Sequence, residues 1–352
     1  MCDNPKMKDM INSLSKKILT VVLLCSLGYG ALACSDKNPP DDPQTDDPTL
    51  YANPVVPRSL PDPTLIRASD GWFYLYATED IRHTPIYRSA DLVEWEFTGT
   101  AFTSETRPDF EPKGGLWAPD INYINGKYVL YYSMSVWGGE WTCGIGVAVA
   151  DSPEGPFTDQ GKLFRSNEID VQNSIDPFFI TEDGRNYLFW GSFRGIYVIE
   201  LSADGLAIFP GAEKKQIAGT AYEGTYILKK DGFYYLFASI GSCCEGVNST
   251  YTTVVGRSEN LMGPYRNKIH QEMMNNRHEV LVKGNDRFVG TGHNSEIVTD
   301  DEGKDWMLYH AVDKLNPKGR VLMLDEVQWN QGWPSVSNGT PSMEWKRPVF
   351  GK

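Results

Sequence analysis

The chain is poor in the side chains that most often bind zinc or build disulfide frameworks. Its 352 residues include 5 histidines and 6 cysteines. No CxxC spacing and no HExxH motif occurs, which excludes the common zinc-site patterns. Only Cys143, Cys243 and Cys244 follow residue 35. We interpret Cys243 and Cys244 as two small buried apolar side chains, with a vicinal disulfide as the alternative.

Basic residues are also scarce, and they form no cluster. Asp and Glu number 46 against 33 Lys and Arg, which gives a net charge of −13 at pH 7. Proteins that bind nucleic acid neutralise phosphates with a basic stripe or patch. The sequence therefore argues against a nucleic-acid partner. The absence of P-loop and GxSxG motifs removes further common enzyme classes.

A long apolar run occurs only near the N-terminus. Two lysines precede ILTVVLLCSLGYGALA at 18–33, which is broken by Gly28 and Gly30 and is short for a transmembrane helix. This pattern predicts a secretory signal peptide over residues 1–33. The ALA-Cys34 ending resembles a bacterial lipobox, in which the cysteine is lipidated and becomes the mature N-terminus.

The segment that follows Cys34, SDKNPPDDPQTDDPT, is rich in Pro and Asp and too polar to fold alone. We expect residues 34–52 to be the lipidated cysteine and a flexible tether, and residues 53–350 to fold as one domain. These expectations describe an exported outer-membrane lipoprotein that faces the periplasm or the cell surface. The lipid anchor is expected to attach the protein to the membrane.

One aromatic-rich motif recurs five times in the predicted domain. Each copy has a turn with Gly and then alternating aromatic and aliphatic residues: SDGWFYLYAT (69–78), INGKYVLYYS (124–133), EDGRNYLFWG (182–191), KDGFYYLFAS (230–239) and DEGKDWMLYH (301–310). Asp-Gly and Asn-Gly between apolar runs predict β-hairpins. Five similar hairpins at roughly blade-length intervals favour an all-β fold, a five-bladed β-propeller, over a large sandwich.

Alignment of the five copies on their turn glycines brings three acids to one position. The aligned residues ahead of the turns are Asp62, Ala118, Asp176, Glu223 and His293. Equivalent ends of the innermost strands converge on the axis of a propeller. A single Asp before Pro often only binds nearby main chain. Three acids at one repeat position instead predict a functional cluster in the central funnel, with His293 in or near the same channel.

Carboxyl groups that face each other across a sugar ring are the minimal apparatus for glycoside hydrolysis. One donates a proton to the leaving oxygen, and the other is ionised and activates water or attacks the sugar. A third can raise the pKa of the acid by like-charge repulsion. Trp117, beside the funnel, is an expected stacking surface for a sugar ring. Asp120 lies inside its strand and is interpreted as a structural acid.

Motifs between about residues 55 and 340 resemble glycoside hydrolase family 43, and more narrowly its endo-α-1,5-L-arabinanases. The motifs are PDPTLI (61–66), LWAPDI (116–121), NSIDPFF (173–179), WGSF (190–193), EGTYILKKDGFYYLF (223–237), SCCEGVNSTY (242–251), VGRSENLMGPY (255–265), GTGHN (290–294) and QWNQGWP (328–334). The resemblance implies a five-bladed propeller with an inverting mechanism. It implies that Asp62 is the general base, Asp176 the pKa modulator and Glu223 the general acid.

The same resemblance implies a set of binding residues. Residues in its motifs that are expected to contact the sugar, beside Trp117, are Asn173, Ser174, Ser192 and Phe193, with Arg320 as a further expected contact. His293 matches a histidine that helps to hold a channel ion, often Ca²⁺. The implied substrate partner is plant arabinan or its oligosaccharides, and no other cofactor is implied.

Two features depart from the arabinanase pattern. Gly224 and Thr225 follow the expected acid where Ala-Pro is common, and the segment 268–288 lacks the expected Gly-rich run. Both lie near the expected substrate path, so exo-acting α-L-arabinofuranosidase or β-xylosidase activity stays an alternative to endo action. A non-catalytic glycan-binding lipoprotein is the alternative from another class. The intact set of acids argues against it.

Overall fold

The computed structural model describes residues 45–79 and 81–351 of the chain. The predicted signal peptide at 1–33 and the lipidation site at Cys34 lie outside the described residues, as does most of the predicted tether. Within the described part, no helix combines the length and the apolar character that a membrane span requires.

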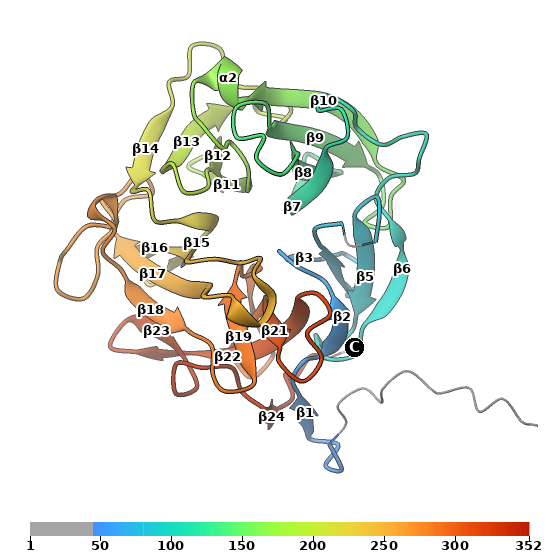
Figure 1. The fold of residues 1–352 in the computed structure, drawn as a ribbon, viewed down its shortest axis with the longest axis vertical. Helices are drawn as coiled ribbons and strands as arrows, with labels where there is room; N and C mark the ends of the chain where they lie inside the picture. The colour runs from blue at the N-terminus through green and yellow to red at the C-terminus, as the bar shows by residue number, and fades with distance from the viewer. Residues whose placement is uncertain (1–44, 80, 352) are drawn as a thin grey trace, which may run out of the picture. The chain divides into compact units, whose positions relative to one another are not determined.

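Five antiparallel sheets surround a common centre (Figure 1). Blade one contains β3 (Thr64–Arg67), β4 (Phe73–Tyr76), β5 (Pro85–Ser89) and β6 (Glu96–Thr100). Blade two contains β7 (Gly115–Ile124), β8 (Lys127–Ser135), β9 (Gly144–Ala150) and β10 (Thr158–Arg165). Blade three contains β11 (Phe178–Glu182), β12 (Arg185–Trp190), β13 (Ile196–Leu201) and β14 (Lys215–Ala218). Blade four contains β15 (Glu223–Lys230), β16 (Phe233–Ile240), β17 (Thr252–Ser258) and β18 (Glu279–Val282).

Blade five joins the two ends of the domain. Its main path is β19 (Phe288–Gly292), β21 (Asp305–Asp313), β22 (Val321–Asn330) and β2 (Val56–Ser59). Two further strands pair at its side, β20 (Ile297–Thr299) with β21 and β23 (Trp333–Val336) with β22. Because β2 comes from the N-terminal side of blade one, the last sheet is completed by the first part of the domain. The prediction of an all-β, five-bladed propeller is confirmed.

Within the described residues, the first strand lies just before the predicted domain boundary at residue 53. β1 (Leu50–Ala52) pairs antiparallel with β24 (Glu344–Lys346), so the last three residues of the predicted tether form a strand. Tyr51 is buried and its hydroxyl donates to the Leu324 carbonyl at 2.7 Å. A polar tether does not explain these contacts, because Tyr51 supplies apolar surface to the core.

Helices are few and short among the described residues. They are α2 (Ser166–Ile169) and the 3-10 turns η1 (Gly246–Asn248) and η2 (Met273–Asn275). Strand sequences that read as apolar runs are buried on both faces, as in β21, where all nine residues are buried. The five predicted hairpin glycines all have φ between +74° and +88°, the left-handed region that tight turns need.

One residue beside the first strand of each blade, or within it, has an unusual backbone conformation. Asp62, Ala118, Asp176 and His293 have φ of 55°, 41°, 60° and 46°, a region that non-glycine residues rarely adopt. In blade four the corresponding residue is Gly224, with φ of 61°. The alignment that placed Glu223 at this position is therefore wrong by one residue. The proposed acid precedes the left-handed residue instead of occupying it.

Candidate active site

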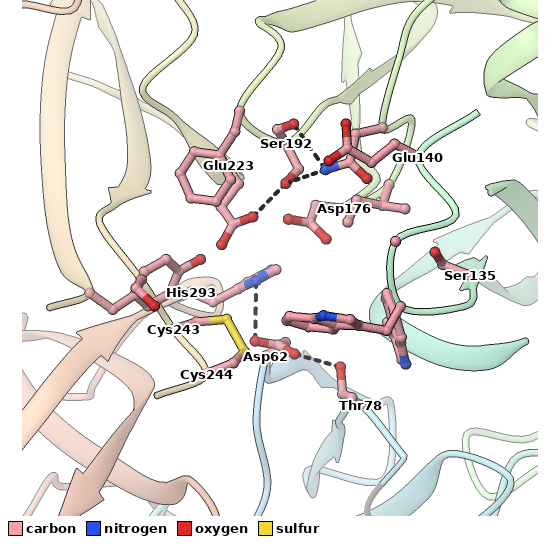
Figure 2. Close-up of a pocket in the computed structure, with 18 of the residues that line it drawn as sticks. Asp62, Thr78, Ser135, Glu140, Asp176, Ser192, Glu223, Cys243, Cys244 and His293 are labelled. Atoms are coloured by element: carbon pink, nitrogen blue, oxygen red, sulfur yellow. Dashed lines mark hydrogen bonds and ion pairs between the residues drawn. A yellow bond between two sulfur atoms is a disulfide. The ribbon is translucent and has the colours of Figure 1, made fainter. Parts of the chain in front are cut away.

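A pocket of about 480 Å³ lies where the inner strands begin (Figure 2). It is lined by Asp62 from blade one, Asp176 from blade three and Glu223 from blade four, so the structure brings the three acids together. All three are buried, with 8%, 6% and 7% of their surface exposed. Further residues predicted from the sequence also line it: Trp117, Asn173, Ser192, Phe193, His293 and Arg320.

Asp62 is surrounded by donors. Its Oδ1 lies 2.9 Å from Arg320 Nη1, and its Oδ2 accepts a hydrogen bond from Thr78 Oγ1 at 2.6 Å. Burial alone would raise the pKa of Asp62. The Arg320 guanidinium is the main group that outweighs burial, with the nearby His310 and His293 rings as further causes, and the pKa of that carboxyl is held well below its usual range. Asp62 is therefore ionised at neutral pH.

Two imidazoles face the same carboxylate oxygen. His293 Nδ1 lies 3.5 Å and His310 Nδ1 lies 3.2 Å from Asp62 Oδ1. Burial, followed by the charge of Arg320, lowers the pKa of His310 to about 4. Burial also lowers the pKa of His293. Both rings are therefore neutral at pH 7, and Arg320 is the permanent positive charge next to Asp62.

Asp176 and Glu223 have a different environment. Asp176 Oδ2 accepts the Gly224 N–H at 3.1 Å, and Glu223 Oε2 accepts a hydrogen bond from Ser192 Oγ at 2.5 Å. Burial, and then repulsion by Glu223 and Asp62, raises the pKa of Asp176 well above its usual range. Burial is also the largest cause that raises the pKa of Glu223. The raised pKa values of both carboxyl groups favour their protonated forms relative to ordinary Asp and Glu.

Two residues at this site were not selected from the sequence. Tyr251 is buried and its hydroxyl hydrogen-bonds Glu223. Its ring stacks on His310, with centroids 5.5 Å apart and planes inclined by 6°. Tyr251 lies in the quoted SCCEGVNSTY motif, which was a usable signal. His310 ends the fifth hairpin motif, a position whose contacts become clear only when the neighbouring blade is present.

Ser174, which the sequence predicts to contact the sugar, does not line the pocket. Its side chain is fully buried, and its Oγ donates to the Val171 carbonyl and accepts from Trp190 Nε1. Neighbouring Asn173 does line the pocket, and its Nδ2 donates to Ser192 Oγ at 2.9 Å. Adjacent residues in this turn point to opposite sides, so only one of them faces the cavity.

Aromatic side chains form part of the pocket rim. Trp117 is half-buried and meets Trp137 edge-to-face, with centroids 6.5 Å apart. Trp137 is 82% exposed and also lines the pocket. It lies in the loop between β8 and β9, where an indole face is accessible to ligand.

Cys243 and Cys244 also line the pocket, joined as a vicinal disulfide. The interpretation of this pair as two buried apolar side chains is wrong. Cys244 is exposed and Cys243 is partly so, because both lie in the loop between β16 and β17 and not in a strand that faces the core. Figure 2 shows the disulfide on one side of the carboxylates and Glu140 on the other. Glu140 is paired with Arg194 at 2.7 Å.

No three His, Cys, Asp or Glu side chains converge to hold a metal ion within the described ranges. Two buried side-chain oxygens nevertheless have no hydrogen-bond partner there: Asn294 Oδ1, next in sequence to His293, and Thr225 Oγ1, next to Gly224, which packs against the His293 ring. Asp120 lies outside the pocket lining, and its Oδ2 accepts from the Phe179 N–H and from Asn122. The Asp120 side chain of blade two thus binds the main chain of blade three.

Comparison with known proteins places the chain in a family. Residues 51–334 match the family described as "Glycosyl hydrolases family 43". The chain is 36% identical over 304 residues to an extracellular exo-α-(1→5)-L-arabinofuranosidase of Cellvibrio japonicus, covering 78% of this chain and 85% of that one. It is 35% identical over 290 residues to an extracellular endo-α-(1→5)-L-arabinanase of Bacillus subtilis, covering 78% and 87%.

Solved structures agree with this assignment. A Cellvibrio cellulosa α-L-arabinanase in complex with arabinohexaose superposes with a TM-score of 0.73 at 34% identity, over 80% of this chain and 96% of that one. An endo-arabinanase from Bacillus licheniformis superposes with a TM-score of 0.71 at 33% identity, over 80% and 98%. A propeller with three buried acids in one pocket is the architecture of a glycosidase. The chain belongs to glycoside hydrolase family 43, and the predicted family is confirmed.

Proposed function

We propose that the protein is an inverting glycoside hydrolase that cleaves internal α-1,5-L-arabinofuranosidic bonds of arabinan, the side chains of plant pectin. The observation that carries this proposal is the opposite shift of carboxyl pKa values within one pocket. The pKa of Asp62 is held well below its usual range, whereas the pKa values of Asp176 and Glu223 are both raised. An ionised base and a protonated acid are the two states that glycoside hydrolysis by inversion requires.

Each carboxyl group has a distinct proposed role. Asp62 takes a proton from water, and the water oxygen forms a bond to the anomeric carbon. As the glycosidic bond breaks, Glu223 gives its proton to the leaving oxygen. Asp176, held by the Gly224 N–H, keeps the pKa of Glu223 raised by repulsion and fixes its geometry. After the products leave, the proton on Asp62 passes to solvent and Glu223 takes a proton from solvent, which restores the starting states.

The proposed substrate rests on the relatives and on the pocket wall. The related proteins named above act on α-1,5-arabinan from chain ends or internally, and one solved relative holds arabinohexaose. Trp117 and Trp137 offer apolar faces on which the C–H faces of furanose rings can stack. Because Trp137 extends the aromatic surface to the exposed rim, it suits a chain that continues beyond the pocket. This favours endo action over the exo alternative.

Product analysis tests the proposal. Linear arabinan digested with the purified protein should give short oligosaccharides early in the time course. Release of arabinose alone from chain ends would replace endo with exo action. Binding without any product would favour the non-catalytic glycan-binding alternative. Proton NMR of the first product should show the β-anomer, and an α-anomer would rule out inversion.

A cation next to His293, with Ca²⁺ as the expected ion, is a further part of the proposal. Asn294 Oδ1 and Thr225 Oγ1 offer neutral oxygens of the kind that Ca²⁺ prefers. When bound, the ion would add positive charge near the Asp62 side of the pocket. Chelation should lower the melting temperature by a few degrees, and added Ca²⁺ should restore it. An unchanged melting temperature would argue against the site.

Export and anchoring complete the proposal. Two relatives are named as extracellular proteins, and a surface disulfide such as Cys243–Cys244 persists in oxidising compartments. Lipidation of Cys34 would hold the enzyme at the outer membrane. A Cys34→Ala variant should move from the membrane fraction to the soluble fraction. An unchanged distribution would show that another segment, or none, provides the anchor.

A further inference from the structure

The second strand of each blade ends near the beginning of the next blade's inner strand. At four of the five junctions a side chain from this end accepts a main-chain N–H across the junction. The four hydrogen bonds are Ala118 N–H to Thr78 Oγ1 at 2.7 Å, Asp176 N–H to Ser133 Oγ at 2.8 Å, His293 N–H to Ser239 Oγ at 2.8 Å, and Asp62 N–H to His310 Nδ1 at 3.1 Å. All four are buried.

These acceptors stabilise a costly backbone conformation. The residues whose N–H groups they bind are the four non-glycine residues with left-handed φ described above. Such a conformation is costly and persists only where surrounding contacts fix it. A buried N–H that lacks an acceptor adds a further penalty. The side-chain acceptor therefore fixes the backbone from which the functional side chain projects.

The junction between blades three and four differs from the others. Gly191 stands where the others carry an acceptor, and a Cβ there would lie 2.1 Å from the Gly195 carbonyl oxygen. No side chain fits at this position, so the Gly224 N–H is free to bind another group. It binds Asp176 Oδ2 at 3.1 Å. The missing acceptor thus gives a main-chain donor to a carboxylate of the pocket.

We propose that His310 and Ser133 are positioning residues for Asp62 and Asp176, and that the small residue at Gly191 is what lets the Gly224 N–H hold the Asp176 carboxylate. This inference rests on the proposed function, because it requires a reaction in which these carboxyl groups act. It predicts that loss of a junction acceptor affects catalysis only where the residue it holds takes part in the chemistry.

His310 is suited to this task by its surroundings. Its ring is fully buried and stacks on Tyr251, which fixes the direction of Nδ1. The ring stays neutral at the pH of the reaction, and in the tautomer that carries its proton on Nε2 the Nδ1 atom accepts the Asp62 N–H. A hydroxyl would be too short to replace the imidazole, whereas the amide oxygen of asparagine can occupy nearly the same place as Nδ1.

The test compares four variants of the full chain on linear arabinan, with kcat, KM and melting temperature measured for each. His310→Leu removes the acceptor at similar volume, and His310→Asn restores one. Ser133→Ala removes the acceptor for Asp176 by deleting one oxygen. Ser239→Ala is the matched control, because it deletes the same kind of hydrogen bond at His293, which carries no carboxyl group.

We expect His310→Leu to lower kcat about 100-fold and Ser133→Ala about tenfold, with KM within about twofold, since misplacement of a reacting group acts on the chemical step. His310→Asn should recover kcat to within about tenfold of the wild type, and Ser239→Ala should change it less than about threefold. The three deletions should lower the melting temperature by comparable amounts.

Three outcomes would overturn the inference. They are an unchanged kcat in both His310→Leu and Ser133→Ala, a Ser239→Ala effect as large as theirs, or no rescue by asparagine. If His310→Leu does not fold, Ser133→Ala against Ser239→Ala decides the question. Failure of the proposed function is distinguishable, because the wild-type protein itself would then release no arabinan fragments.

Discussion

Asp62 and Glu223 lie in one pocket with almost equal exposure, 8% and 7%, yet their pKa values move in opposite directions. Burial raises the pKa of each carboxyl group by removing water. On the Asp62 side, Arg320 and two imidazoles outweigh that effect. On the Glu223 side, hydrogen bonds from Ser192 and Tyr251 do not, and the charge of Asp62 adds to the rise.

The difference shows that neighbouring charge, and not depth of burial, assigns the two proton states. Arg320 precedes β22 of blade five and reaches Asp62 at the beginning of blade one. Asp176 and Glu223 come from blades three and four, and repulsion by neighbouring carboxylates raises the pKa of each, by Glu223 and Asp62 for Asp176 and by Asp62 for Glu223. The circular arrangement therefore separates a positive side of the pocket from a side that carries two acids. The following predictions test this division, from the largest effect to the smallest.

Asp62→Asn should abolish most activity. It removes the ionised base and leaves the cation of Arg320 without its partner. General base catalysis supports a fall in kcat of about 10⁴-fold, with binding of arabino-oligosaccharide retained. Calorimetric titration with oligosaccharide, beside a kcat measurement, checks both parts. Turnover within tenfold of the wild type would remove Asp62 as the base.

Glu223→Gln should lower kcat on arabinan by about 10³-fold, because the leaving oxygen loses its proton donor. Glu140→Gln is a suitable comparison, since Glu140 also lines the pocket but is paired with Arg194. It should change kcat far less. If both variants lose similar activity, removal of charge from the pocket, and not of the acid, explains the result.

Asp176→Asn should lower kcat roughly tenfold to a hundredfold and shift the pH profile. Repulsion by Asp176 disfavours the ionised form of Glu223, so its loss lowers the pKa of Glu223. Activity requires protonated Glu223 and disappears as pH rises through that pKa. The alkaline limb should therefore move to lower pH. An alkaline limb at the wild-type pH would show that Asp176 does not raise the pKa of Glu223.

Arg320→Met should have the smallest effect at neutral pH, about tenfold, and should act on the opposite limb. Without the guanidinium, burial raises the pKa of Asp62. On acidification Asp62 is then protonated, and activity lost, at a higher pH than in the wild type. The acid limb should move to higher pH. An unmoved acid limb would mean that the imidazoles suffice.

The same ion pair links stability to pH. The folded-state pKa of Asp62 is depressed, so its contribution to the free energy of unfolding is present above the unfolded value of about 3.9. That contribution is lost as pH falls through the lower folded-state value. The wild-type protein should lose it on acidification, whereas Arg320→Met should lack most of it already at neutral pH. Melting temperatures from pH 7 to about pH 2 for the two proteins check this, because the loss falls between the unfolded and the lower folded-state pKa.

Much of this arrangement could be predicted from the sequence, because residues at the same place in each repeat occupy equivalent positions in the blades. Five hairpin motifs predicted the blades, and alignment on their glycines brought Asp62, Asp176 and Glu223 to one funnel. The alignment failed by one residue in blade four. There Gly224 takes the left-handed position, and a pattern of apolar residues does not reveal a single φ angle.

The remaining errors concern side-chain direction and contacts between blades. Ser174 and Asn173 are adjacent, and only the turn conformation decides which of them faces the pocket. Cys243 and Cys244 suit a core or a loop equally well by composition. The partner of Arg320 lies at the other end of the domain sequence, and the hydrogen bond from Asp62 to His310 appears only when the first and last blades meet.

That meeting point has a consequence for how the enzyme matures. β2 completes blade five, and Asp62 follows it directly at the beginning of blade one. Main-chain hydrogen bonds join the first and last parts of the domain here, including one from the Leu60 N–H to the Arg320 carbonyl at 2.9 Å. A chain whose last blade has not docked therefore has no oriented base. Hydrolytic activity therefore depends on docking of the last blade against the first, because that contact brings Arg320 to Asp62.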